Sequence, residues 1–271
     1  MKGNHFKKNS KSKKNKSKKS NTIETIITII LLIIFIAVFV YSAYHIIYWF
    51  KSNSDLKALE EGIFSEVVKV EQNTENEQSE GNQVETEKPK KSIDFEKLNQ
   101  VNSETIGWVC IENTNINYPI VQAKDNEYYL KRDIYKQKNS CGTIFLDCKT
   151  KPDFSENNTV IYGHNLKSGG MFADLNKIYS GELGDNIQIE IYTKEHSYLY
   201  QIVTAYVAEP SLDIVKKSFS TDNEKQQYLN KAIKKSRVKF KNSEELKGDI
   251  ITLITCYGEQ RVVVSAVKIE Q

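Results

Sequence analysis

The sequence predicts a mostly-β domain with accessory helices, an α+β fold whose strands form a sandwich or a closed barrel. After residue 92, eight segments are rich in Val, Ile, Tyr and Thr and are separated by turn residues, which is typical of strands. Eight such strands favour a sandwich or a barrel. Helical periodicity between them is confined to three stretches, so the helices are expected to be accessory.

The first segment of the chain is a basic tail. Residues 1–20 hold nine lysines and no acidic residue, whereas residues 92–271 are close to neutral. A protein that binds nucleic acid would carry its excess positive charge on the folded domain. The sequence therefore predicts a basic tail over residues 1–22 and no nucleic-acid partner.

A transmembrane signal-anchor helix is predicted over residues 23–50. Ile26–Phe50 contains no charged residue, and at ~1.5 Å per residue it spans roughly 37 Å, more than a hydrocarbon core of about 30 Å. A cleaved signal peptide would have a shorter apolar core and small residues at its cleavage site, which this segment lacks. By the positive-inside rule the tail stays cytoplasmic, and everything after Lys51 lies outside the cell membrane.

Residues 51–91 are predicted to be a juxtamembrane helix followed by a disordered acidic spacer. Apolar residues in Asp55–Val70 recur with a helical period, at positions 56, 59, 63, 67 and 70. Residues 71–91 are rich in Glu, Asn, Gln and Lys and have almost nothing to bury. The folded domain is therefore expected to cover residues 92–271.

This domain is expected to begin with a helix that Asp94 caps and that buries Phe95, Leu98 and Val101. Val, Ile, Tyr and Thr then dominate the predicted strands, which cover 107–112, 116–122, 141–147, 158–163, 186–193, 196–209, 249–256 and 261–269.

Three helices are expected among the strands. Asp125–Arg132 and Gly170–Ile178 are short candidates. Thr221–Ser236 is stronger, because Thr221 and Glu224 fit a capping box in front of an apolar stripe. This helix is expected to pack on the outside of the barrel.

The cysteine pattern does not predict a disulfide between Cys141 and Cys148. They flank the predicted strand Gly142–Asp147, which would separate their Cα atoms by about 23 Å, against a limit of ~7 Å for a bridge. Cys110 lies in an apolar strand pattern and is interpreted as a small core residue. Cys256 requires a separate explanation.

Cys256 lies near the end of Asp249–Arg261, which reads DIITLITCYGEQR. A hairpin with a four-residue loop over residues 257–260 would place Cys256 directly opposite Arg261, with Cβ atoms about 4.5–5.5 Å apart. A guanidinium beside a thiol favours the nucleophilic thiolate and can stabilise a developing oxyanion. The alternative is a core cysteine at a strand end with an arginine at the rim.

A cysteine nucleophile in acyl transfer needs a group that protonates the leaving group, and histidine is the usual one. Of the four histidines, His5 lies in the tail, His45 in the anchor, and His196 in a polar strand start. His164 ends a predicted strand and enters the loop HNLKSGG, where catalytic groups are often presented. His164 is the remaining candidate; an ordinary loop histidine is the alternative.

Several separated stretches, in this order, resemble class B sortases. The clearest is TLITC at residues 252–256, which is similar to the T-L-x-T-C signature of sortases, with Arg261 at the start of the next strand. The other matching stretches are GWVCIENTNINYPIVQAKDNEYYL at 107–130, GTIFLD at 142–147 and VIYGHNLKSGGMFADL at 160–175.

The resemblance covers residues 92–271 and implies an eight-stranded sortase barrel with a helix before the TLITC strand. It implies that Cys256 attacks the threonine carbonyl of a C-terminal sorting motif in secreted proteins and forms a thioester. His164 would protonate the leaving amine and then activate an amine of a peptidoglycan precursor, while Arg261 holds the carbonyl or its oxyanion. Neither a metal nor an organic cofactor is needed. The implied location is a Gram-positive cell surface.

The resemblance also implies substrate-binding residues. Asn126 and Leu130 lie in a segment that lines the substrate groove in class B enzymes, and Ile254 and Thr255 directly precede the cysteine. Two departures concern substrate preference: Ile254 stands where class B members often have serine, and the loop between Cys256 and Arg261 is shorter than usual.

Two other functions remain open on the sequence. A cysteine peptidase would pass the same acyl-enzyme to water, and a surface binding or scaffold protein would keep the barrel without turnover. Papain-like enzymes and L,D-transpeptidases also pair cysteine with histidine. This chain, however, has no S-H-G-C motif, and its cysteine follows its histidine, opposite to the papain order.

Overall fold

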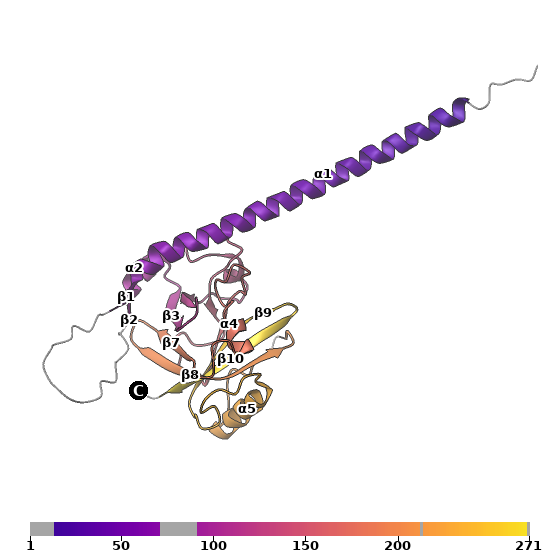
Figure 1. Cartoon of the computed structure of the whole chain (residues 1–271). Helices are drawn as coiled ribbons and strands as arrows, with labels where there is room; N and C mark the ends of the chain where they lie inside the picture. Colours follow the sequence, from indigo (N-terminus) through magenta and orange to yellow (C-terminus); the bar gives the residue numbers. More distant parts are fainter. Residues whose placement is uncertain (1–13, 71–90, 212–213, 270–271) are drawn as a thin grey trace, which may run out of the picture. The chain divides into compact units, whose positions relative to one another are not determined.

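The computed structural model describes residues 14–70, 91–211 and 214–269 and divides the chain into two compact units (Figure 1). The first unit ends at Lys51 and the second begins at Ser52. Most of the predicted tail and of the predicted spacer lies outside the described residues.

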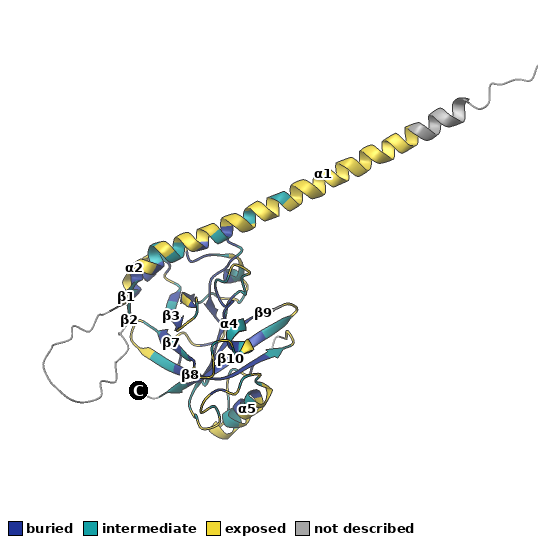
Figure 2. Cartoon of the chain, in the orientation of Figure 1, coloured by how far each residue is buried: buried dark blue, intermediate teal, exposed yellow. Residues whose placement is uncertain are grey.

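The long helix α1, Lys14–Leu59, contains the predicted anchor, and its part up to Lys51 is what the structure describes of the first unit. It is part of the one helix, among the described residues, that is long and apolar enough to cross a membrane by length and composition. The large apolar side chains between Ile23 and Phe50 are exposed (Figure 2). A bilayer-spanning helix needs such a surface to face lipid.

The end of α1 belongs to the second unit and continues into a π-helical turn, η1 (Glu60–Phe64), and a short α2 (Ser65–Val67). Gly62 breaks the helical geometry with φ −93° and ψ −110°. The predicted juxtamembrane helix therefore ends at Val67. After it, β1 (Val68–Val70) pairs antiparallel with β2 (Lys91–Ile93).

This juxtamembrane segment packs as part of the barrel's core. Leu56, Phe64 and Val67 are each at most 5 % exposed and join the cluster that contains Trp108 and Tyr118. The folded unit therefore starts about forty residues earlier than the sequence suggested. The periodicity indicated a helix, but it could not show which surface covers the apolar face of that helix.

Eight strands close a barrel in the order β10-β8-β7-β3-β4-β5-β6-β9, which confirms the predicted fold class and all eight strand positions. The β4–β5 and β6–β9 pairs are parallel and the others antiparallel. The barrel strands are β3 (Thr105–Ile111), β4 (Asn117–Val121), β5 (Phe145–Leu146), β6 (Asn158–Tyr162), β7 (Gln188–Tyr192), β8 (Ser197–Ala208), β9 (Ile250–Tyr257) and β10 (Gln260–Ile269).

Strand β5 is much shorter than the predicted 141–147. Gly142 has a φ of +64°, and its N–H bonds to the Asn139 carbonyl at 3.3 Å, so the chain turns here. Thr143 then bonds to the Tyr129 carbonyl at 3.0 Å instead of joining the sheet. The glycine that starts this segment is the sequence signal for the turn.

The helices lie near their predicted positions. They are α3 (Phe95–Val101, capped by Asp94), the 3-10 turn η2 (Tyr128–Lys131), α4 (Leu175–Ser180) and α5 (Asp222–Lys235, capped by Thr221). The N–H of Glu224 donates to the Thr221 hydroxyl at 3.1 Å, while the Glu224 carboxylate accepts from Ser220 N–H at 2.8 Å. The capping pattern thus fixes the start of α5.

Strands β6, β9 and β10 are covered on both faces. Ile161, Leu253 and Val262 belong to the interior cluster. The alternate residues Val160, Ile254 and Val263 form a second cluster on the outer face together with Val215 and Ala232. The outer face is therefore covered by α5 and by the connection between β8 and α5.

Candidate active site

Strand pairing brings Cys256 of β9, Arg261 of β10 and His164, two residues after the end of β6, into one row. Arg261 is the register partner of Cys256, as the hairpin spacing predicted. On the other side of β9, Tyr162 of β6 pairs with Ile254, which places His164 level with Cys256 two residues further on. Neighbouring strands are about 4.8 Å apart. Residues two apart in a strand share a face, so Cys256 and Arg261 lie on the outer face that carries Ile254 and Val263. The hydrogen bond from Gly163 N–H to the Ile254 carbonyl continues the β6–β9 pairing as far as His164.

Three hydrogen bonds fasten the His164 end of β6 to the strand that carries Cys256. Gly163 N–H donates to the Ile254 carbonyl at 3.2 Å, and the buried Thr255 hydroxyl donates to the Gly163 carbonyl at 2.8 Å. Asn165 Nδ2 then donates to the Cys256 carbonyl at 2.7 Å, where the next backbone ladder bond would have formed. These bonds fix the backbones on both sides of the row.

His164 is oriented by a backbone carbonyl. Its Nε2 lies 2.7 Å from the Leu130 oxygen, and because a carbonyl only accepts, Nε2 carries the proton. Nδ1 is therefore the nitrogen that can exchange a proton with another group. A Cβ on Gly142 would lie 3.0 Å from His164 Cδ2 and 2.7 Å from the Tyr129 oxygen, so this close packing requires glycine.

Arg261 keeps most of its donors available. Its Nη1 donates to the Gln260 carbonyl at 2.8 Å, and the side chain is only partly buried. No carboxylate of the described residues forms an ion pair with it. The hairpin turn has two residues, Gly258 and Glu259, rather than the four expected, because Tyr257 and Gln260 also pair. Gly258 has a φ of +59°, as the first central residue of a type II′ turn requires.

The four predicted substrate-binding residues differ in how far their side chains are buried and in what they contact. Ile254 is 3 % exposed in the outer cluster, and Thr255 is 2 % exposed with its hydroxyl on Gly163. Asn126 bonds through both side-chain atoms to Asp147 and to Cys148 N–H. Leu130 is partly buried and packs against the cluster of Val121, Tyr129 and Phe145. Their role in substrate binding stays a prediction.

Two features of this site had no signal strong enough to be found in the sequence. The Leu130 carbonyl acts through backbone, which no side-chain pattern reveals. Asp147 is fully buried and accepts from Lys217, Asn126 and Lys149. Burial alone would raise its pKa, but these donors, the Lys217 ammonium above all, hold the pKa of Asp147 below its usual value.

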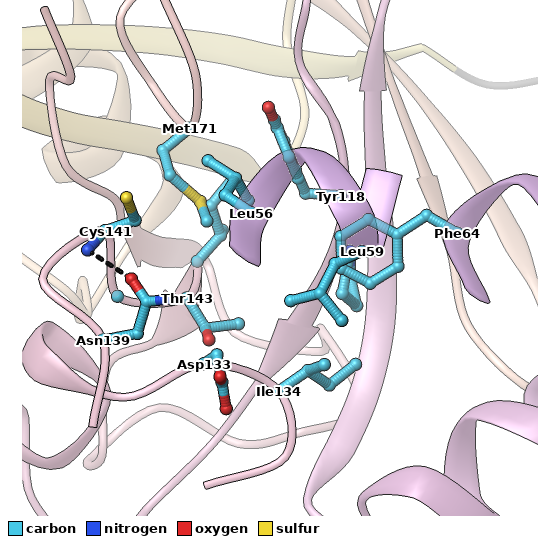
Figure 3. A pocket seen from close by; sticks show the side chains of 13 residues that line it. Leu56, Leu59, Phe64, Tyr118, Asp133, Ile134, Asn139, Cys141, Thr143 and Met171 are labelled. Carbon is cyan, nitrogen blue, oxygen red and sulfur yellow. Dashed lines mark hydrogen bonds between the residues drawn. The ribbon is translucent and has the colours of Figure 1, made fainter. Parts of the chain in front are cut away.

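A small apolar pocket lies behind the loops that orient His164. Leu56, Leu59 and Phe64 of the juxtamembrane segment face Ile134, Cys141 and Met171 across it (Figure 3). The lining also includes Gly142, which lies directly beside the His164 ring. The juxtamembrane segment therefore packs against the loop that carries Gly142, the neighbour of His164.

A closed barrel that aligns a histidine, a cysteine and an arginine in one row is the framework of a cysteine acyl-transfer enzyme. The sortase domain matches residues 109–269 of the chain. The chain therefore belongs to the sortase family, and its relatives place it in class B, whose members are cysteine transpeptidases.

Two curated relatives support the class. Sortase B of Listeria monocytogenes is 34 % identical over 164 residues, which cover 60 % of this chain and 67 % of that protein. Sortase B of Staphylococcus aureus is 30 % identical over 178 residues, which cover 64 % of this chain and 73 % of that protein.

Solved structures agree with the fold. The structure of Bacillus anthracis sortase B in complex with AAEK1 matches with a TM-score of 0.65 and 29 % identity, covering 82 % of this chain and all of that one. Clostridium perfringens sortase B matches with a TM-score of 0.59 and 29 % identity, covering 65 % and 100 %. The eight-stranded barrel with accessory helices is the sortase B fold.

Proposed function

We propose that this class B sortase cleaves a C-terminal sorting motif of secreted proteins after threonine and transfers them to an amine of a peptidoglycan precursor. The observation that carries the proposal is the pairing of Cys256 with Arg261 across β9 and β10, with His164 following two residues after the β6 strand that pairs with β9. A scaffold protein would not need these three side chains aligned.

In the first half-reaction the Cys256 thiolate attacks the threonine carbonyl carbon. Arg261, one strand away, stabilises the negative charge that develops on the oxygen. The carbon–nitrogen bond then breaks, and the amine leaves with a proton from Nδ1 of the His164 imidazolium. A thioester on Cys256 remains.

The second half-reaction runs in reverse with a new amine. The acceptor amine attacks the thioester and gives its proton to His164 Nδ1, and the thiolate of Cys256 leaves. Because Nε2 donates to the Leu130 carbonyl in both protonation states, the ring keeps its orientation while Nδ1 changes. No other group has to shuttle the proton.

We further infer that α1 anchors the enzyme as a single pass, with the lysine tail cytoplasmic and the barrel outside. The apolar surface between Ile23 and Phe50 and the lysine-rich tail support this orientation. A secreted substrate and a peptidoglycan acceptor are both met on that side.

The test uses the full chain in detergent micelles with a library of internally quenched sorting-motif peptides. A sortase B that matches this chain has been crystallised with Gly3, so triglycine is the first acceptor to try. We expect cleavage after threonine and a ligated product by mass spectrometry, and Cys256→Ala and His164→Ala should abolish both. Full cleavage by Cys256→Ala would refute the nucleophile, and only hydrolysed acid at saturating amine would favour a peptidase.

A further inference from the structure

Asp147, immediately after β5, is a buried carboxylate on which three separate segments converge. Its Oδ2 accepts from Lys217 Nζ at 2.5 Å, from Asn126 Nδ2 at 2.9 Å and from the Tyr162 hydroxyl at 3.3 Å. Its Oδ1 accepts from Lys149 N–H at 2.9 Å. The Asp147 side chain is fully buried, while that of Lys217 is 31 % exposed. None of these groups takes part in the proposed chemistry.

One of the three segments packs on the outer face of β6 and β9. This segment, Ile214–Lys217, places Val215 in the cluster with Val160 and Ile254. Its backbone is held at the Lys216 carbonyl, which accepts from the buried Asn158 amide at 2.8 Å. Lys217 is the charged attachment of this segment to the barrel.

The second segment, residues 126–130, lies on the other side of Tyr162. Leu130 and Tyr162 both pack against the buried cluster that contains Phe145, and the Leu130 carbonyl orients His164. Asn126 is its attachment to Asp147. Tyr162 belongs to both apolar clusters, so the two segments border the same stretch of outer face, one residue pair before the His164–Cys256 row.

We propose that Lys217 and Asp147 form a positioning pair that holds the segments 214–217 and 126–130 on either side of the face where the peptide substrate binds. The peptide must approach Cys256 along this face, and so its affinity depends on where the two segments stand. The role in substrate affinity rests on the proposed function, whereas the structural coupling of the two segments does not.

The physical reason is the burial of the carboxylate. A buried charge that loses its partner is strongly unfavourable, so removing the ammonium forces Asp147 either to take up a proton or to reach water. Either response disturbs the Asn126 and Tyr162 hydrogen bonds that share Oδ2. A change in one segment is thereby transmitted to the other across the barrel face.

The neighbouring residue provides a matched control. Lys216 also forms an ion pair, with Glu224, but both partners are well exposed at the surface. Lys217→Met and Lys216→Met remove the same charge one residue apart in the full chain. Lys217→Arg restores a cation and should rescue the loss in part.

The first measurement is amide hydrogen exchange, which needs no substrate. We expect Lys217→Met to speed exchange in both segments, 214–217 and 126–130, and Lys216→Met to leave residues 126–130 unchanged. Unchanged exchange in residues 126–130 of Lys217→Met would overturn the coupling, whether or not the enzyme cleaves any peptide.

The second measurement is steady-state kinetics with the best motif peptide. We expect Lys217→Met to raise KM by roughly tenfold while kcat and the rate of Cys256 alkylation by iodoacetamide stay within about twofold, the pattern of lost substrate binding. Lys217→Arg should recover part of the KM. A normal KM in a Lys217→Met enzyme that shows faster exchange would overturn the role in substrate affinity.

Discussion

The Thr255 hydroxyl illustrates how a buried side chain can serve the site without touching substrate. It donates to the Gly163 carbonyl directly before His164 and so ties the histidine to the cysteine strand. We expect Thr255→Val, which keeps the shape, to lower stability by about 1–2 kcal/mol because it removes a buried hydrogen bond. Urea unfolding and kcat/KM of the full chain measure both consequences, and kcat/KM should fall.

Thr159 is the control for this substitution. It is 1 % exposed, and its hydroxyl has no hydrogen-bond partner among the described residues. Thr159→Val should therefore be neutral or slightly stabilising and leave kcat/KM unchanged. The same stability and the same kcat/KM in the two variants would show that the Thr255 hydrogen bond does not position the site.

The four cysteines are free thiols in distinct environments. Burial, followed by the nearby Glu60 and Asp55, raises the pKa of Cys141 to about 11, and burial also raises the pKa of Cys110. A raised pKa leaves little thiolate at pH 8, and the thiolate is the reactive form. Iodoacetamide should therefore modify Cys256 and Cys148 first, as peptide mass mapping can follow.

The loss of activity should follow the modification of Cys256 and not that of the other cysteines. A Cys148→Ser enzyme is expected to lose activity to iodoacetamide at the rate of the unchanged protein. If iodoacetamide inactivated the Cys148→Ser enzyme more slowly, Cys148 rather than Cys256 would be the thiol that matters. Early labelling of Cys141 would contradict the burial of that thiol.

At the residue scale, the sequence could predict contacts that depend on local spacing. Cys256 and Arg261 pair across a hairpin, so counting residues was enough to place them together. His164 lies about ninety residues away in sequence, and only the β6–β9 pairing brings it level with Cys256. Asp147 and Lys217 are also far apart in the sequence, and no local pattern indicated that they form a pair.

The β9–β10 hairpin is the element on which the row depends. Its two-residue turn places Gly258 at a φ of +59°, and a Cβ there would meet nothing within 4 Å. Gly258→Ala should therefore cost only backbone strain, about 1–2 kcal/mol. Because the turn sets how Cys256 faces Arg261, kcat/KM should fall as well, measured below the unfolding transition.

Gly184 is a matched glycine outside the site. It has a φ of +82°, also with nothing within 4 Å of an added Cβ, and lies between α4 and β7. Gly184→Ala should lose similar stability but keep kcat/KM. A parallel loss of kcat/KM in both variants would mean that the turn has no special role.

Helix starts were predictable where a capping side chain marks them, whereas the ends of strands were not. Asp94 and Thr221 mark helix starts through their own side-chain hydrogen bonds. The hairpin loop was predicted too long because Tyr257 and Gln260 form one more pair than polar loop residues suggest. Strand β5 was predicted too long because Gly142 turns the chain and Thr143 bonds to Tyr129 of η2 instead of joining the sheet.

For the whole molecule, the decisive unexpected feature is that the folded unit begins at Ser52. The Ser52 hydroxyl accepts from Ser140 N–H at 3.3 Å, and the Tyr118 hydroxyl donates to Glu60 at 2.5 Å. These bonds join the juxtamembrane segment to the loop that precedes Gly142 and to strand β4. A sequence pattern shows an apolar helix face but not the partner that covers it.

The last prediction compares two fragments, one beginning at Ser52 and one at Ser92, both ending at Gln271. The shorter fragment loses Leu56, Phe64 and Val67 from the core, and each such side chain contributes about 1.5–3 kcal/mol when buried. Their sum approaches the whole stability of an ordinary domain, roughly 5–15 kcal/mol. We expect the longer fragment to unfold cooperatively and cleave peptide, and the shorter one to melt far lower or aggregate. Calorimetry measures the melting temperatures of the two fragments, and a peptide cleavage assay measures their activities. Equal melting temperatures would mean that the juxtamembrane segment only tethers the domain to the membrane.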